Sequence, residues 1–101
     1  FVSAEVRHIN ATFDNNSNRV VIAYRNDASS DNGFAVVGSI SGTSITYGTP
    51  VTFNSASSND IAMTFDSNSN KVVIAYKDSG NSSYGTAIVG TVDSSDWSNF
   101  W

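Results

Sequence analysis

The sequence contains no cysteine, a single proline, a single histidine and only five basic residues among 101. The absence of cysteine excludes a disulfide scaffold and any site built on a thiolate. An isoelectric point near 4.4 and a formal charge of −4 do not fit the basic surface of a nucleic-acid-binding domain. No apolar run approaches the roughly 18 residues that a membrane-spanning helix needs, so we expect no membrane partner.

Small polar residues dominate what is present, since 18 Ser, 12 Asn and 8 Thr make up 38 of the 101 residues. Hydrophobic residues still reach 40% and aromatic residues 12%, which is enough to form a core and argues against disorder. The length fits one small domain.

An internal repeat organises the chain. Residues 1–49 align with residues 53–101 at a constant offset of 52 without a gap, and 20 of these 49 pairs are identical. The densest block runs from Thr12 to Tyr24 and recurs from Thr64 to Tyr76. The chain is therefore interpreted as a tandem duplication, with a first unit at residues 1–52 and a second at residues 53–101.

Each unit is predicted to hold four strands, because short apolar bursts alternate with turns rich in Asp, Asn, Ser and Gly. No stretch shows the 3.6-residue period of a helix, so the fold class is all-β. The middle strands carry apolar residues on both faces, which requires other sheets as cover on both sides. The expected strands are Arg7–Phe13, Arg19–Arg25, Gly33–Ile40 and Ser44–Phe53 in the first unit, and Asp60–Phe65, Lys71–Lys77, Gly85–Val92 and Ser95–Trp101 in the second.

Four short antiparallel strands in each unit of about 50 residues, stacked face to face, describe two blades of a β-propeller. The run from Phe13 to Tyr24, its copy from Phe65 to Tyr76 and the segment from Tyr84 to Val92 carry a resemblance to a known repeat. They resemble tandem propeller-type repeats of environmental bacterial and phage-associated proteins. The resemblance implies the fold and brings no catalytic residue with it. The segment from Asp93 to Trp101 departs from the pattern.

Two blades cannot close a propeller, which typically needs four to eight. We therefore expect copies of the chain to assemble head to tail into a ring through a heterologous interface. The chain of 101 residues is three shorter than twice the 52-residue offset, so a following copy would continue the register after skipping three positions. A trimer of six blades is favoured over a tetramer of eight. The alternatives are a piece of a longer array, a two-sheet sandwich and a swapped dimer.

Polar residues that differ between the two units mark a first candidate site at the entry to each first strand. In a closed ring these side chains would repeat around the mouth of the channel and could bind an ion or a small ligand. The alternative is a solvated lining with contacts between Arg7 and Asp60. One histidine and one glutamate specify neither a catalytic triad nor a His-rich zinc site. The residues are Glu5, Arg7 and His8 in the first unit, and Ser57, Asn59 and Asp60 in the second.

Aromatic residues define a second candidate site. Trp97 and Trp101 lie near the C-terminus, and Tyr84 and Phe34 each follow a loop rich in Asn and Asp. Flat rings beside short polar side chains are typical of a sugar-binding cleft, in which the ring stacks on the apolar face of the sugar. The alternative is that the two tryptophans cover the outer strand or seal the seam between chains.

The repeated pattern Asp14-x-Asn16-x-Asn18 matches the first half of a calcium loop. Arg19 stands where that loop needs glycine, and the basic Arg25 stands where it needs a bidentate glutamate. Asp and Asn also suit tight turns, because they bond their own backbone and tolerate a positive φ. We interpret both copies as turns and expect no metal and no cofactor.

The function that the sequence favours is a non-catalytic binding or structural module whose partners are copies of itself. Carbohydrate binding through rim aromatics and Asn or Asp side chains is the leading concrete form, with glycans as the further partner. The alternatives are a structural repeat of a phage or surface protein without a small ligand, and a hydrolase that uses rim aspartates. The sequence favours no compartment.

Overall fold

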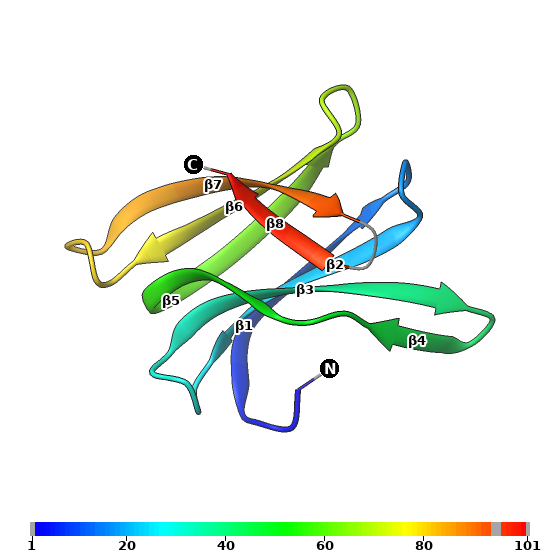
Figure 1. Cartoon of the computed structure of the whole chain (residues 1–101). Coiled ribbons are helices and arrows are strands. Elements are labelled where there is room, and N and C mark those ends of the chain that lie inside the picture. Colours follow the sequence, from blue (N-terminus) through cyan, green and yellow to red (C-terminus); the bar gives the residue numbers. More distant parts are fainter. Residues whose placement is uncertain (1, 94–95, 101) are drawn as a thin grey trace.

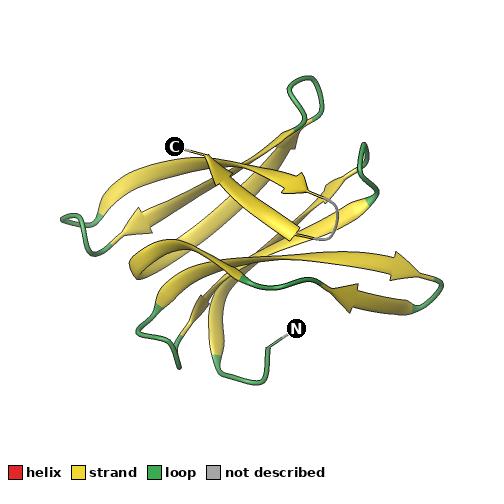
Figure 2. Cartoon of the chain, in the orientation of Figure 1, coloured by secondary structure: helices red, strands yellow, loops and turns green. Residues whose placement is uncertain are grey.

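The computed structural model describes residues 2–93 and 96–100, with side chains described as far as residue 92 (Figure 1). The described residues form strands and turns without a helix (Figure 2). The predicted all-β class is confirmed. No helix that could cross a membrane occurs in this part of the chain. The strands are β1 (Val6–Asp14), β2 (Arg19–Asn26), β3 (Asn32–Ser41), β4 (Ser44–Tyr47), β5 (Val51–Asp66), β6 (Lys71–Asp78), β7 (Tyr84–Asp93) and β8 (Asp96–Phe100).

The strands form one open antiparallel sheet in the order β1-β2-β3-β5-β6-β7-β8, with β4 attached to β3. Strand β5 is 16 residues long and belongs to both halves of this sheet. Its first part pairs with β3, and its second part pairs with β6. We call β1 to β4 with the first part of β5 the first half-sheet, and the rest of β5 with β6 to β8 the second half-sheet.

Among the described residues, the strand expected from Ser44 to Phe53 differs clearly from the prediction. It divides into β4 and the start of β5, which lie one after the other along the same edge of β3. Between them, the N–H of Gly48 donates to the carbonyl of Val37 at 2.8 Å, and Pro50 has no N–H to continue a ladder. The start of β5 then runs without a break into the strand expected from Asp60.

The backbone repeats its irregular features at the 52-residue offset of the sequence. Strand β1 has a bulge between Arg7 and Asn10, and β5 has one between Asn59 and Ala62. Positive φ values occur at equivalent non-glycine positions of both units. The four pairs are His8 and Asp60, Asn18 and Asn70, Ser30 and Ser82, and Asp31 and Ser83. The two units therefore share their local conformation as well as their residues.

Residues paired across neighbouring strands point to the same side of a sheet. By this rule, each half-sheet has apolar residues on both of its faces. We call them the front face and the back face. The main core is formed where the back face of the first half-sheet packs on the front face of the second. The front faces carry Ile9, Phe13, Ile22, Tyr24 and Val36 in the first half-sheet, and Ile61, Phe65, Ile74, Tyr76 and Ile88 in the second; the back faces carry Val21, Ala23, Ala35 and Val37, and Val73, Ala75, Ala87 and Val89.

This packing leaves one apolar face on each half-sheet without a sheet partner. Ile9 on the front face of the first half-sheet is 52% exposed, whereas its equivalent Ile61 is 7% exposed. Val89 on the back face of the second half-sheet is 37% exposed, whereas its equivalent Val37 is 1% exposed. The same residue at the same place in the repeat is thus core in one unit and surface in the other.

The front face of the first half-sheet is partly covered by the chain itself. Ile22, Tyr24 and Val36 form a second small core there, against which Val2 and Val6 pack. Cover is absent farther along β1, where Phe13 is exposed like Ile9. The two cores therefore protect three of the four faces in whole or in part and leave the back face of the second half-sheet open.

Candidate functional site

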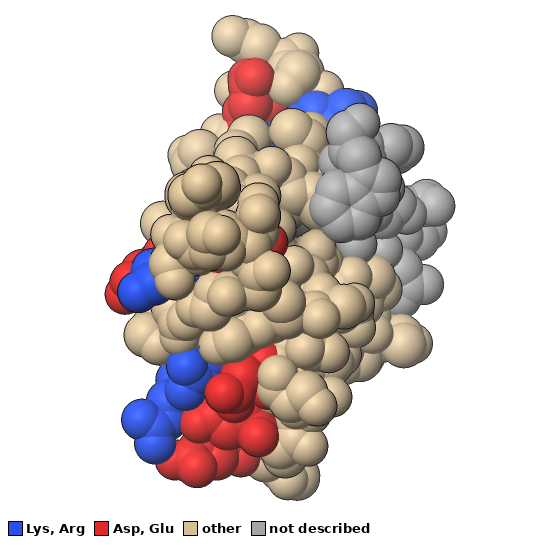
Figure 3. Space-filling model, turned by 90° about the vertical axis from the view of Figure 1, so that its left-hand side faces the viewer, with Lys and Arg blue, Asp and Glu red and all other residues tan. Residues whose placement is uncertain are grey.

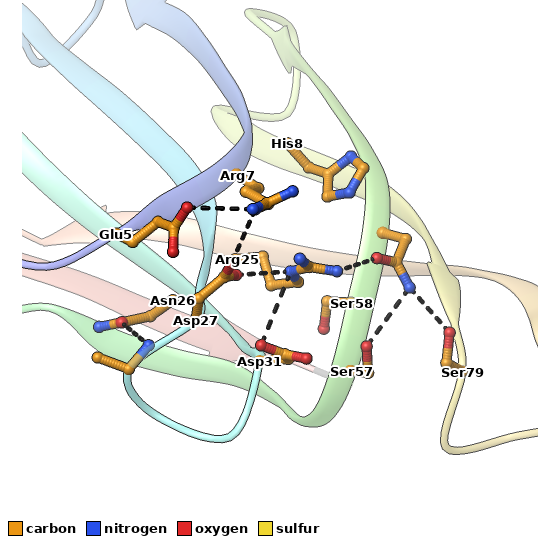
Figure 4. Close-up of polar contacts among 12 residues, drawn as sticks. Glu5, Arg7, His8, Arg25, Asn26, Asp27, Asp31, Ser57, Ser58 and Ser79 are labelled. Atoms are coloured by element: carbon orange, nitrogen blue, oxygen red, sulfur yellow. Dashed lines mark hydrogen bonds and ion pairs between the residues drawn. The ribbon is translucent and has the colours of Figure 1, made fainter.

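The two bulges bring His8 and Asp60 together at the strand entries. Each residue takes a left-handed conformation, with φ of 54° at His8 and 51° at Asp60. A bulge adds an unpaired residue and redirects its side chain, and here the two bulged strands lie close to each other (Figure 4). The His8 Nδ1 atom lies 3.9 Å from the Asp60 Oδ1 atom.

An arginine network extends this site from β1 to β2 and β5. The Arg7 guanidinium contacts the Glu5 carboxylate at 3.1 Å and the Asp27 carboxylate at 2.8 Å. Arg25 donates to the other oxygen of Asp27 at 2.8 Å and to Asn59 Oδ1 at 2.6 Å. Arg25 on β2 therefore links the two half-sheets, and both arginines share one carboxylate (Figure 4). We call these residues with His8, Asp60 and Asp31 the polar cluster.

The electrostatics of the polar cluster are those of a satisfied ion-pair network. The hydrogen bond from Arg25 is the main cause that holds the pKa of Asp27 below its ordinary value, with further lowering by Arg7. The hydrogen bond to Glu5 is the main cause that raises the pKa of Arg7. Both shifts favour the charged forms. Charged side chains gather mainly toward one end of the face shown in Figure 3, and most of that face is uncharged.

Within the chain, Arg7 pairs with its own unit rather than with Asp60. Arg7 is held by Glu5 and Asp27 from its own unit, and His8 is the residue beside Asp60. The reason is the bulge, which separates neighbouring positions of β1 by giving His8 a positive φ.

The second unit builds the same frame with neutral groups. The Ser79 N–H donates to the Ser57 carbonyl at 3.0 Å, as the Asp27 N–H donates to the Glu5 carbonyl at 3.0 Å in the first unit. Where Arg7 pairs with Asp27, its equivalent Asn59 donates to the Ser79 hydroxyl at 2.8 Å. The same backbone contact therefore occurs in both units, and the first unit adds charged side chains to it.

The ionisable groups of the polar cluster differ in how far they are engaged. No group of three or more His, Asp and Glu side chains that could hold a metal occurs among them. The carboxylates of Glu5 and Asp27 already accept from arginine. The pair His8 and Asp60 remains partly exposed and is the part of the cluster that a ligand could reach.

The Asp14 and Asp66 loops are tight turns, and this interpretation is confirmed. Asp14 Oδ1 accepts from the N–H groups of Asn16 and Ser17, both at 3.0 Å. Asp66 Oδ1 accepts from the equivalent N–H groups of the second unit at 3.0 and 3.4 Å. One carboxylate oxygen of each aspartate is therefore used to close its own turn. The Asn16 side chain also donates to the other turn, at the Ser67 carbonyl and the Asn70 side chain.

The aromatic residues of the second candidate site are not gathered into one cleft by the described part of the chain. Phe34 stacks on Tyr24 with ring centroids 5.9 Å apart and belongs to the small core. Tyr84 is 62% exposed at the start of β7. Trp101 and the side chain of Trp97 lie outside the described residues.

Sequence reasoning missed Arg25, Asp27 and Asp31 as members of the polar cluster. A signal was available, because Asp27 and Asp31 differ from their equivalents Ser79 and Ser83. At these two positions only the first unit carries a charged side chain. Comparisons with known proteins found no matching family model, no matching curated protein and no matching solved structure.

Proposed function

We propose that this chain is a non-catalytic module of two propeller blades that assembles head to tail with other copies of itself. The observation that carries the proposal is the unequal exposure of identical residues. Ile9 and Val89 lie on faces whose equivalents, at Ile61 and Val37, are core. Apolar surface exposed in this pattern is typical of an interaction surface.

The open back face of the second half-sheet and the partly covered front face of the first are complementary in the same way as the two faces that form the core. Inside the chain, the small residues of a back face, such as Ala23 and Ala35, receive the bulky residues of a front face, such as Ile74. The back face left open has small residues at the same places and forms a hollow of about 170 Å³. The uncovered part of the front face of the first half-sheet presents the bulky side chains of Ile9 and Phe13. The hollow is lined by Ala62, Met63, Thr64, Val73 and Ala75.

Because the interface joins two different faces, its repetition produces a ring or a filament rather than a closed dimer. Each chain would add two blades, so a ring has an even number. Six blades from three chains fall in the middle of the four to eight that propellers use, and we favour this trimer over a tetramer. The resemblance of the Phe13–Tyr24 run to propeller-type repeats supports the same architecture.

A ligand on the rim is a secondary proposal. The exposed ring of Tyr84 favours stacking on the apolar face of a sugar, and the polar cluster provides charged partners at the strand entries. Phe34 does not contribute to such a site, because its ring is engaged with Tyr24. No arrangement of a nucleophile with a base supports the alternative of a hydrolase within the described residues.

The mass of the protein in solution tests the proposed function. Analytical ultracentrifugation of the wild type is expected to show a species of three times 10.7 kDa. Ala75→Glu places a carboxylate in the hollow and is expected to shift the mass toward the single chain. Thr46→Glu is the matched control, because it adds the same charge to an exposed position on β4. A single species of 10.7 kDa at every concentration would overturn the proposal.

A further inference from the structure

Strand β7 has an edge that is only partly used. Strand β8 pairs with β7 from Val89 to Asp93. From Tyr84 to Ile88, the described residues supply no partner on that side, although β6 pairs on the other side. An open edge presents unpaired N–H and C=O groups and accepts an added strand.

The equivalent edge of β3 is filled. Strand β4 occupies its far part, as β8 does on β7. The near part, Asn32 to Ala35, pairs with the start of β5, which places Asn32 opposite Ser57 and Gly33 opposite Asn54. The chain that leads into the second unit therefore closes the edge of the first.

Gly33 and Gly85 show what this closing strand requires. A Cβ atom on Gly33 would lie 2.5 Å from the Phe53 ring and 2.8 Å from the Ser58 hydroxyl. A Cβ atom on Gly85 would meet no described atom within 4 Å. Gly33 is needed for close approach of the next segment, and Gly85 offers the same space empty.

We propose that the residues leading into β1 of one copy add as a strand to the open edge of β7 in a second copy. The inference rests on the proposed function and names its contact. Shifting the β3–β5 register by 52 residues places Glu5 of one chain opposite Tyr84 of the other, and Val2 opposite Gly85. The repeat position of Phe53 corresponds to Phe1, which lies outside the described residues.

The loop before β7, one partner of this contact, already has the conformation of its equivalent in the first unit. The loop that ends at Ser83 has the positive φ values of its equivalent, with 54° at Ser82 and 60° at Ser83. In the first unit, the Asp31 carbonyl of that loop accepts from the Ser58 N–H at 3.1 Å. The Ser83 carbonyl is thus presented to the equivalent N–H, that of Val6 in a second copy.

The incoming segment is also held in place by its own unit. The Glu5 carbonyl accepts from Asp27 as the Ser57 carbonyl accepts from Ser79. Val2 packs on the small core of its own half-sheet, and its equivalent Asn54 donates to Ser58 and Asp78 of its own unit. Side chains that face their own unit leave the backbone of the segment available to a neighbour, as in β5. These anchors place the segment beside its own unit, and residues 2–5 would extend on pairing as the equivalent residues 54–57 do in β5.

Engineered cysteines test the register, since the chain has none of its own. Glu5→Cys and Tyr84→Cys variants, mixed and mildly oxidised, are expected to give a disulfide-linked pair of chains, because directly opposed residues lie within disulfide distance. The double variant with Asn32→Cys and Ser57→Cys is the in-chain control and should close without joining chains. Replacing the second partner by Thr86→Cys shifts the register and should reduce cross-linking roughly fivefold or more.

Gly85→Val tests the empty space. It is expected to leave the urea unfolding of the single chain unchanged, since nothing lies near Gly85, and to weaken self-association roughly tenfold or more. Gly33→Val is the matched change in the filled position and should prevent folding. A wild type that assembles while the matched cysteines fail to cross-link, or while Gly85→Val assembles as tightly, overturns the inference and leaves the proposed function intact. A monomeric wild type overturns both.

Discussion

Ile9 and Ile61 offer the sharpest test of how the chain uses its two units. Both residues follow a bulge with a positive φ, and both occupy the same repeat position. Replacing either by alanine therefore changes local conformational preference to the same degree. Only the environment differs, because Ile61 is core and Ile9 is half exposed.

The magnitudes follow from burial. Truncating a buried isoleucine to alanine typically costs 2–5 kcal/mol, since lost transfer free energy and a cavity add together, so we expect about 3 kcal/mol for Ile61→Ala. Ile9 is half exposed, so Ile9→Ala loses only about half of the transfer free energy of a buried side chain. Solvent fills the space that is left, and the expected cost is about 1 kcal/mol or less. With a urea m-value of about 1.5 kcal/mol/M, the two midpoints should differ by more than about 1 M.

Equilibrium urea unfolding followed by tryptophan fluorescence measures this difference, at a concentration where the single chain prevails. Ile9→Ala should then show its larger effect at high concentration, as weaker self-association, because the proposed interface buries this position. If the two variants cost the same in the single chain, within about 0.5 kcal/mol, the result would refute the difference in cover between the two front faces at this repeat position.

Two further predictions concern the aspartates. The pKa values of Asp27 and Asp66 are lowered, mainly by hydrogen bonds from Arg25 and from the Ser69 hydroxyl, respectively. Because these folded-state values lie below the ordinary 3.8, the stabilisation is complete above that pH and is lost as the pH falls through the lowered values. The Tm should therefore drop between roughly pH 5 and pH 2, less steeply in Asp27→Asn; an equal slope would contradict the assignment. Asp14→Ala removes the acceptor of two turn N–H groups and should cost about 1–2 kcal/mol in urea unfolding, without any effect of added calcium on the wild type; a cost near zero would contradict the role of the turn.

The strands were predictable from the sequence because alternation and turn residues act locally. The turns at Asp14 and Asp66 are hydrogen-bonded within three residues of the aspartate. The division of the strand from Ser44 to Phe53 had a local signal in Gly48 and Pro50, because proline cannot continue a ladder. The sequence does not show, however, where the segments on either side of the break pair. That pairing depends on how β4 and β5 share one edge of β3, which is a tertiary property.

The exposure of each face could not be predicted from the sequence for a more basic reason. The two units are nearly the same, so local pattern assigns Val37 and Val89 the same environment. Their difference arises only from which half-sheet lies in front of which. The duplicated sequence therefore predicts two kinds of apolar face, and the structure adds which copy of each kind is unused.

Some of the residues that differ between the units lie where the units touch. Arg25 meets Asn59, the equivalent of Arg7, and His8 meets Asp60, its own equivalent. If the units had remained identical there, Arg25 would face an arginine, and like charges at that distance repel. Divergence at these positions makes the two units complementary to each other. Contact between unlike units is therefore sufficient to explain the polar cluster, and ligand binding at His8 and Asp60 would be an addition to that role.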